Sequence, residues 1–362
     1  MKAAVLYETN TPLVIEEISV QKPSAHEVLI KTAVSGLCHS DLHFIEGLYP
    51  HPLPVVLGHE AAGIVEQVGS EVSYVKPGDP VVTCLSVFCG TCEYCTTGRP
   101  MSCSNTEVKL PPGQSRRLLW DKPEQLHTGF NLSAFAEQML VHENALVKIR
   151  KDMPLDRAAL IGCGVLTGFG AVVNTAKVAM GDTIAVIGCG GVGMAAINGA
   201  YIVGAGRIIA VDINPVKLQL AAKFGATDLV NPNDGDPVAQ IKELTKGGVH
   251  HAFECLGTKI TAEQSFQMLA VGGTATLVGM VPFGEKIELH GFDFLRDRKI
   301  QGSTMGSNRF RVDMPRMIDL YLQGRLHLDD WISSRITLDE INEGFTAMKE
   351  GKVVRSVIDF GA

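Results

Sequence analysis

The stretch Thr183-Ile-Ala-Val-Ile-Gly-Cys-Gly-Gly-Val-Gly193 decides the fold. Residues 183–187 have the β-branched, apolar composition of a buried parallel strand, and the glycines after them permit a tight turn. Residues 192–203 then favour a helix, and residues 207–211 favour a second strand that ends at Asp212, 19 residues after Gly193. A strand, a glycine turn, a helix and a strand with an acidic end form the fingerprint of a dinucleotide-binding unit.

The chemistry of this fingerprint predicts the cofactor. Glycines let the backbone approach a pyrophosphate at the positive end of a helix, and Asp212 is placed to accept hydrogen bonds from the ribose hydroxyls. Ile213 follows, with no adjacent Arg, so the carboxylate should repel a 2′-phosphate and favour NAD over NADP. The loop residues expected to contact the cofactor are Gly188, Gly190, Gly191, Val192 and Gly193.

The alternation of helices and strands continues along the chain. Helices are expected over 215–224, 238–244 and 261–270, and strands over 228–230, 249–255, 274–278 and 299–302, which together predict a doubly wound parallel sheet in an α/β protein.

The flanking segments have a different pattern. Before residue 150, short β-rich pieces at 28–34, 63–68 and 80–84 are separated by turn residues and predict a small, irregular β domain. Near the end, Thr337 and Glu340 form a capping box before a helix, and a last strand over 353–360 is expected to return to the N-terminal domain. We predict a discontinuous catalytic domain over 1–164 and 303–362, with a Rossmann NAD-binding domain inserted at 165–302.

Composition excludes several classes of protein. The 362 residues are 46% hydrophobic and 20% charged, which is typical of a globular chain of two domains. The net charge is −7 and no basic run is present, so nucleic acid is not an expected partner. The N-terminal sequence Met1 to Glu8 meets a charge too soon to hold the apolar stretch of a secretory signal, which favours the cytoplasm. The uncharged stretch 183–206 contains seven glycines and indicates a strand, turn and helix, so no membrane is expected either.

The nine cysteines are odd in number, which argues against a disulfide framework. Four of them, at 89, 92, 95 and 103, have the C-x2-C-x2-C-x7-C spacing of a turn-rich loop that can surround one tetrahedral ion. We interpret Cys89, Cys92, Cys95 and Cys103 as a structural zinc site, with an iron–sulfur cluster as the competing interpretation.

Cys38, His59 and Cys163 suggest a second metal site. Two thiolates, an imidazole and one open position describe a catalytic zinc, which takes a water or an alcohol oxygen at the open position. Because 104 residues separate His59 from Cys163, spacing alone leaves open that each is an ordinary core residue.

With these residues in hand, the chain resembles the zinc-containing alcohol dehydrogenases of the medium-chain dehydrogenase/reductase superfamily over nearly its whole length. The motifs that carry the resemblance occur in the family's order at 36–41, 58–63, the four-cysteine lobe, 162–164 and 188–193. The resemblance implies a GroES-like β-rich catalytic domain and an inserted Rossmann domain, two zinc ions per chain and NAD.

The resemblance also implies roles for individual residues. Cys38, His59 and Cys163 would hold the catalytic zinc, Glu60 would lie behind it as an exchanging ligand, and Asp41 would orient His59. Ser40 would take the alcohol proton and pass it through the nicotinamide ribose towards His43, for which a surface histidine is the alternative interpretation.

Three basic residues are implied to contact the cofactor. His39 and Arg355 match positions that approach the pyrophosphate, and Lys217 would lie near the adenosine ribose with Asp212. Basic side chains on a solvated face are the alternative for all three.

The implied reaction is oxidation of an alcohol to the aldehyde, in which Zn²⁺ lowers the alcohol pKa and hydride passes to NAD⁺. The aligned pocket positions Tyr49, Leu85 and Phe130 are large and apolar, which favours a medium-chain or aromatic primary alcohol. Glutathione-dependent formaldehyde dehydrogenases use an Asp and an Arg where this chain has Tyr49 and Glu107, so we disfavour that activity.

Other functions remain as alternatives. An alcohol oxidoreductase that keeps its nicotinamide bound and uses an external acceptor would have the same fingerprint. A non-catalytic relative and a zinc-free quinone or enoyl reductase are disfavoured because the ligand set and Ser40 are present. The long segment 104–132 resembles the dimeric branch of the family, so we expect a homodimer, with a tetramer as the alternative.

Overall fold

The structure is a computed structural model that describes residues 1–361. The chain forms two compact units. The first unit contains Met1–Cys163, Arg309–Leu322 and Leu328–Ala362, and the second contains Gly164–Asn308 and Gln323–His327. These borders differ slightly from the predicted ones. The second unit also contains residues 164, 303–308 and 323–327, which we predicted to lie in the catalytic domain.

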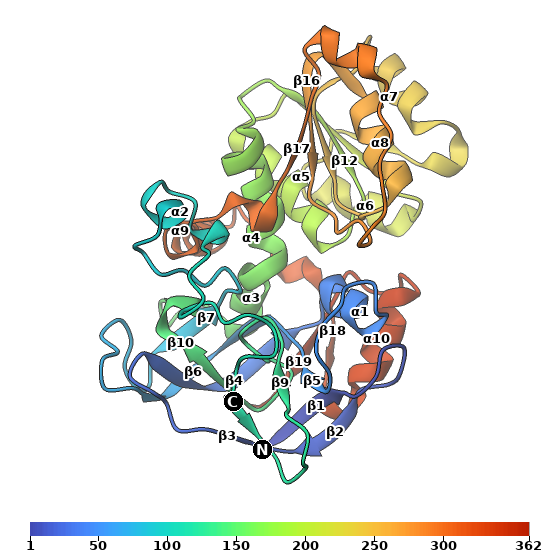
Figure 1. The fold of residues 1–362 in the computed structure, drawn as a ribbon. Coiled ribbons are helices and arrows are strands. Elements are labelled where there is room, and N and C mark those ends of the chain that lie inside the picture. Colours follow the sequence, from blue (N-terminus) through green and yellow to red (C-terminus); the bar gives the residue numbers. More distant parts are fainter. Residues whose placement is uncertain (362) are drawn as a thin grey trace. The chain divides into compact units, whose positions relative to one another are not determined.

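The second unit contains a six-stranded parallel sheet with the order β14-β13-β12-β15-β16-β17 (Figure 1). This doubly wound order confirms the predicted α/β Rossmann architecture, with β12 and β15 flanking the point where the strand order reverses. The regular elements of this unit are α4 (Leu166–Gly170), β12 (Thr183–Ile187), α5 (Gly191–Val203), β13 (Arg207–Val211), α6 (Pro215–Lys223), β14 (Asp228–Val230), α7 (Pro237–Thr245), β15 (Val249–Glu254), α8 (Lys259–Gln267), β16 (Leu269–Leu277) and β17 (Lys299–Gly302).

A left-handed backbone conformation and a close approach explain the glycine turn after β12. Gly188 has φ of +92°, a left-handed conformation that favours glycine. A Cβ on Gly193 would lie 1.8 Å from the Gly188 carbonyl oxygen, so any side chain there would force the first turn of α5 away from the strand. The turn therefore places the amino end of α5 at the carboxyl end of β12.

One predicted helix boundary is wrong. We expected a helix over 261–270, but α8 ends at Gln267 and Leu269 already pairs with Val249 of β15. The register then shifts before His251 pairs with Thr274, and Gly272 within the shifted segment has φ of +78°. The glycine pair 272–273 thus marks a bulge inside one long strand rather than the start of a strand.

The first unit is built mainly from antiparallel sheets, of which the largest has the order β11-β7-β6-β4-β19-β18 with β10 also paired to β4. A smaller sheet has the order β2-β1-β5-β9. The regular elements are β1 (Lys2–Leu6), β2 (Val14–Glu17), β3 (Ser19–Val20), β4 (Glu27–Gly36), α1 (His39–Ile45), β5 (Val55–Val56), β6 (Glu60–Val68), β7 (Pro80–Thr83), α2 (Glu93–Thr96), β8 (Leu118–Leu119), β9 (His127–Thr128), β10 (Gln138–His142), β11 (Leu146–Lys148), α3 (Leu155–Leu160), α9 (Phe310–Leu322), β18 (Ile332–Ile336), α10 (Ile341–Lys349) and β19 (Arg355–Asp359).

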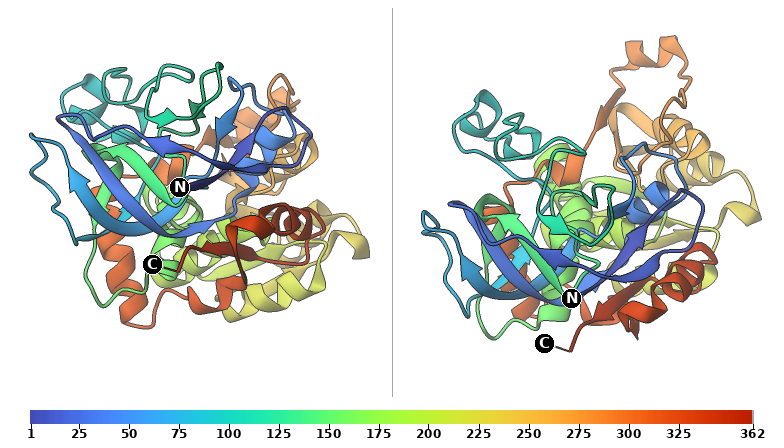
Figure 2. Two further views of the ribbon diagram at one scale, coloured as in Figure 1. Left: turned by 90° about the horizontal axis from the view of Figure 1, so that it is seen from below. Right: turned by 60° about the horizontal axis from the view of Figure 1, so that its bottom comes forward.

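The C-terminal strand returns to the N-terminal part of the chain, as predicted. Strand β19 pairs with β4, where Val357 faces Gly36 and Ile358 faces Ser35. Figure 2 shows the red C-terminal elements beside the blue N-terminal strands. The capping box of Thr337 and Glu340 is also present before α10. This pairing brings the start of β19 next to the segment that follows β4.

One helical stretch, Leu155–Ala176, is long and apolar enough to cross a membrane, but 83% of its apolar window is buried within the protein. It therefore has the character of a core helix. It is not the uncharged stretch 183–206 considered above, which forms β12, the glycine turn and α5.

Candidate active site and structural metal centre

Three buried side chains of the first unit converge on one point. Cys38 precedes α1, His59 precedes β6, and Cys163 follows α3. Their ligand atoms lie within 4.8 Å of one another, and His59 Nε2 is 3.2 Å from Cys163 Sγ. Gly58 has φ of +91°, and a Cβ there would lie 2.6 Å from the Phe135 nitrogen, so a glycine is needed before His59.

The orientation of His59 is fixed by Asp41. Asp41 Oδ1 accepts a hydrogen bond from the Gly58 N–H at 3.0 Å and lies 3.1 Å from His59 Nδ1. Burial raises the pKa of Asp41, while the adjacent His59 opposes that rise. Because a carboxylate accepts, Nδ1 carries the proton and the lone pair of Nε2 faces the two cysteine sulfurs. This is the arrangement that a metal-binding histidine needs.

Glu60 lies behind the three ligands. Its side chain is fully buried, and neither carboxylate oxygen has a hydrogen-bond partner among residues 1–361. Burial raises its pKa to about 7, against the lowering effect of Arg355, whose Nε lies 3.5 Å from Glu60 Oε1.

Arg355, which the resemblance places near the pyrophosphate, is buried beside Glu60. Its side chain is 3% exposed, Nη1 donates to the Leu37 carbonyl at 2.6 Å, and its charge faces Glu60. The contact between Arg355 and Glu60 results from the pairing of β19 with β4. In the sequence, only the strand expected over 353–360 pointed to that pairing.

The donor set of this first site fits a catalytic zinc. Two thiols and one oriented imidazole supply three ligands, and a structural site would need a fourth. Three converging ligand atoms and a buried carboxylate that accepts no hydrogen bond would be costly without a further cation beside Arg355. We therefore assign Cys38, His59 and Cys163 as the residues that would hold it.

The four cysteines at 89, 92, 95 and 103 form a second, closed set in the first unit. The Sγ–Sγ distances are 3.9 Å for Cys89–Cys95, 3.5 Å for Cys92–Cys95 and 3.8 Å for Cys92–Cys103. A tetrahedron with Zn–S bonds of ~2.3 Å has edges of about 3.8 Å, so the set fits one zinc ion better than an iron–sulfur cluster.

Hydrogen bonds to the sulfur of Cys89 favour its thiolate form. The N–H groups of Thr91 and Cys92 donate to this sulfur at 3.4 and 3.2 Å, and the Thr91 hydroxyl lies 3.5 Å from it. These bonds, that of the Thr91 side chain first, lower the pKa of Cys89 to about 6. A thiolate is the form that binds zinc.

Helix α1 presents the residues expected to move the proton. Ser40 Oγ lies 3.7 Å from Cys38 Sγ. His43 lies three residues further along the same helix, and its buried Nδ1 has no hydrogen-bond partner in the described chain. Burial lowers the pKa of His43, and its ring stacks on Tyr49 with 6.1 Å between centroids. His39, by contrast, is exposed at the start of α1.

In the second unit, Asp212 is fixed beside the glycine turn. Its carboxylate accepts from the N–H groups of Cys189 and Asn214, each at 2.8 Å. Lys217 follows in the first turn of α6 and is half-buried. The carboxylate and the turn thus occupy neighbouring strand ends, as the fingerprint requires.

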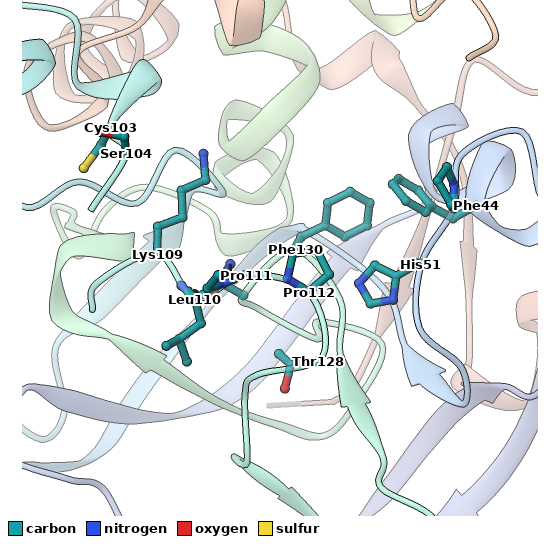
Figure 3. Close-up of a pocket in the computed structure, with 12 residues that line it drawn as sticks. Phe44, His51, Cys103, Ser104, Lys109, Leu110, Pro111, Pro112, Thr128 and Phe130 are labelled. Atoms are coloured by element: carbon teal, nitrogen blue, oxygen red, sulfur yellow. Dashed lines mark hydrogen bonds between the residues drawn. The ribbon is translucent and has the colours of Figure 1, made fainter. Parts of the chain in front are cut away.

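The pocket residues predicted from the sequence are only partly brought together. Phe130 lies 4.4 Å from the His59 ring and 5.1 Å from the Phe44 ring, between centroids, and it lines a pocket of about 380 Å³. Tyr49 lines a neighbouring pocket of about 160 Å³, while Leu85 packs against a hydrophobic core and lines neither. The larger pocket (Figure 3) is lined by Phe44, Pro50, His51, Cys103, Ser104, Lys109, Leu110, Pro111, Pro112, Thr128, Phe130 and Asn131.

Both units match known family models. Residues 24–151 match the alcohol dehydrogenase GroES-like domain, and residues 191–323 match the zinc-binding dehydrogenase family.

Individual relatives match over almost their entire length. An S-(hydroxymethyl)glutathione dehydrogenase from Photobacterium damsela subsp. piscicida is 40% identical over 99% of both chains. Among solved structures, an alcohol dehydrogenase zinc-binding domain protein from Burkholderia ambifaria has a TM-score of 0.94 at 36% identity, covering 100% of this chain and 99% of that one. A benzyl alcohol dehydrogenase from Acinetobacter calcoaceticus has a TM-score of 0.93 at 34% identity, with 99% and 98% covered.

Proposed function

The chain belongs to the zinc-containing alcohol dehydrogenase family of the medium-chain dehydrogenase/reductase superfamily, whose cofactors are zinc and NAD, and from this membership we propose that it oxidises a medium-chain or aromatic primary alcohol reversibly to the aldehyde. The observation that carries the proposal is the apolar pocket whose wall, Phe130, touches the ring of His59. Aromatic and proline side chains around that pocket suit a flat or flexible apolar alcohol.

The chain's own residues would divide the chemistry among them. Zinc, when bound by Cys38, His59 and Cys163, supplies a Lewis acid that lowers the pKa of the alcohol, and NAD⁺ supplies the hydride acceptor. Asp41 holds the His59 ring in its metal-binding tautomer.

The proton would leave through α1. The Ser40 hydroxyl would accept the proton from the alcohol oxygen while it releases its own, and His43 would receive that proton by way of the nicotinamide ribose when NAD is bound. His43 suits this role because its Nδ1 has no hydrogen-bond partner within residues 1–361 and burial lowers its pKa, so the ring is neutral near pH 7. Glu60 would serve as an exchanging ligand, and His39, Lys217 and Arg355 as cofactor contacts.

The name of the S-(hydroxymethyl)glutathione dehydrogenase relative supplies a second candidate substrate. Tyr49 is an aromatic wall residue and Glu107 is an exposed anion, so neither offers the charge that the carboxylates of glutathione would need at the aligned positions. We therefore rank the primary alcohol above the glutathione adduct.

The test is a comparison of kcat/KM on the purified protein with NAD⁺. We expect benzyl alcohol or hexanol to exceed a mixture of formaldehyde and glutathione by at least about tenfold, the factor that one lost charge-assisted contact produces. A preference for the formaldehyde–glutathione mixture would overturn the assignment. If NAD⁺ is reduced neither by the alcohols nor by the formaldehyde–glutathione mixture, but an artificial electron acceptor is, a tightly held nicotinamide would be favoured.

We also propose that the protein acts in the cytoplasm as a homodimer. The support for the cytoplasm is that all nine cysteines are free, which a reducing compartment favours, and the support for the dimer is the length of segment 104–132. Sedimentation at several protein concentrations separates a dimer from a tetramer.

A further inference from the structure

His51 occupies a position that the proposed chemistry does not use. It follows α1 in sequence and lines both the pocket of about 380 Å³ and the neighbouring pocket of about 160 Å³. Its ring meets Phe44 edge to face, with 5.9 Å between centroids. Phe44 in turn contacts Phe130, the residue that touches His59. A short chain of rings therefore joins His51 to the candidate active site.

The hydrogen-bond state of His51 is determined by its neighbour. Nδ1 lies 2.8 Å from the Pro52 carbonyl, which can only accept, so Nδ1 carries a proton. Burial lowers the pKa of the ring, against the raising effect of that bond, so the imidazole is neutral near pH 7. Nε2 is left with a lone pair, and Figure 3 shows the ring directed towards Pro112 and Phe130.

The other polar groups of the larger pocket are mostly committed elsewhere. The Thr128 hydroxyl donates to Ser115 Oγ at 2.9 Å. The Asn131 amide is bonded in both directions to the backbone of Leu110, with both distances 3.0 Å. Lys109 is half-buried on a flexible stem that can keep its ammonium group in water. His51 Nε2 is thus a fixed acceptor in largely apolar walls.

We propose that His51 Nε2 accepts a hydrogen bond from a hydroxyl group on the body of the substrate, so that this pocket selects a hydroxylated aromatic primary alcohol of the hydroxybenzyl type. The proposal rests on the proposed function and names the substrate class for the same site. The rings of Phe44 and Phe130 and the neighbouring prolines accommodate the flat aromatic ring of the substrate. His51 Nε2 accepts the hydrogen bond from the hydroxyl group on that ring.

A different ligand would use Lys109 instead. An alcohol that carries a carboxylate would pair with this cation and gain nothing from a neutral acceptor. The two possibilities predict opposite behaviour of His51 and Lys109, which makes Lys109→Gln the matched control.

The experiment measures kcat/KM on the zinc-loaded enzyme with NAD⁺ for 3- and 4-hydroxybenzyl alcohol, the corresponding methoxybenzyl alcohols and 4-(hydroxymethyl)benzoate. A methoxy group keeps the shape but cannot donate. In the wild type and in Lys109→Gln we expect the hydroxy compound to exceed its methoxy partner by about five- to tenfold, the value of one neutral hydrogen bond. In His51→Phe the ratio should fall to about one, and His51→Gln, which restores an acceptor, should recover part of it.

A parallel calorimetric titration with the same alcohols in the absence of NAD⁺ measures binding without turnover. An unchanged hydroxy-to-methoxy ratio in His51→Phe, or a preference for the carboxylate that disappears in Lys109→Gln, would overturn the proposal. If none of the alcohols is oxidised but hydroxybenzyl alcohol still binds through His51, the proposed function fails while the assignment of His51 stands. If hydroxybenzyl alcohol is oxidised with the same hydroxy-to-methoxy ratio in the wild type and in His51→Phe, the proposed function stands and the assignment of His51 fails.

Discussion

The two metal centres of the first unit differ in how the chain builds them. The four cysteines lie within 15 residues, from Cys89 to Cys103, and neighbouring backbone N–H groups in the same loop donate to their sulfurs. Cys38, His59 and Cys163 come from distant segments, are buried, and depend on Asp41 and a carboxylate behind them. From this difference we expect the four-cysteine centre to stabilise its loop, and the buried Cys38–His59–Cys163 centre to carry the chemistry, because its ligands meet only when distant segments of the chain are folded together.

The largest effect should come from removing a ligand of the buried centre. His59→Ala should lower kcat/KM by about a thousandfold or more, since a Lewis acid supplies several kcal/mol of transition-state stabilisation and each ~1.4 kcal/mol is tenfold. Zinc content should fall by one ion per chain, with secondary structure retained. Elemental analysis and NADH absorbance check this, and a fully active variant would refute the ligand assignment.

Removing a ligand of the four-cysteine centre should act on stability. Cys92→Ser should also lose one zinc per chain, but it should lower the thermal midpoint by about 10 °C or more, because a structural metal contributes directly to folding. Cys84→Ser is the matched control, since Cys84 is a buried thiol outside both ligand sets. A stable Cys92→Ser protein that lacks only activity would reverse the roles of the two centres.

The buried centre should also depend on Asp41. Asp41→Asn keeps an acceptor for the Gly58 N–H but removes the charge that orients His59, so zinc affinity should fall by about 10- to 100-fold. Competition with a chromophoric chelator measures the change. Equal affinity in Asp41→Asn and wild type would show that the carboxylate does not support the ligand.

The smallest effect is expected from a single hydrogen bond in the four-cysteine loop. Thr91→Val removes the hydroxyl that lies 3.5 Å from Cys89 Sγ and leaves both backbone donors, so zinc release should accelerate by no more than about fivefold. Thr97→Val, which loses a 2.8 Å bond to the Glu93 carbonyl in the same loop, should leave the release rate unchanged. Equal acceleration in both variants would mean that the loop, rather than the sulfur contact, controls release.

The same contrast explains what the sequence could predict. The glycine turn, Asp212 and the four cysteines are local patterns, and the sheet order and the closed cysteine set agree with them. Cys38, His59 and Cys163 carry little spacing information, and only their resemblance to a family suggested that they meet.

Contacts that depend on long-range packing were not predictable in the same way. Arg355 faces Glu60 because β19 pairs with β4, and Leu85 packs into a core rather than lining the larger pocket. His51 carried no sequence signal, since the position of its proton follows from the contact of Nδ1 with the Pro52 carbonyl, which only the folded loop shows.

Zinc-dependent turnover is tested by following NADH absorbance on mixing the purified protein with excess NAD⁺ and benzyl alcohol, before chelation, after it and after zinc is returned. We expect NADH formation that chelation abolishes and added Zn²⁺ restores. Undiminished NADH formation in protein shown to be free of zinc would contradict this expectation.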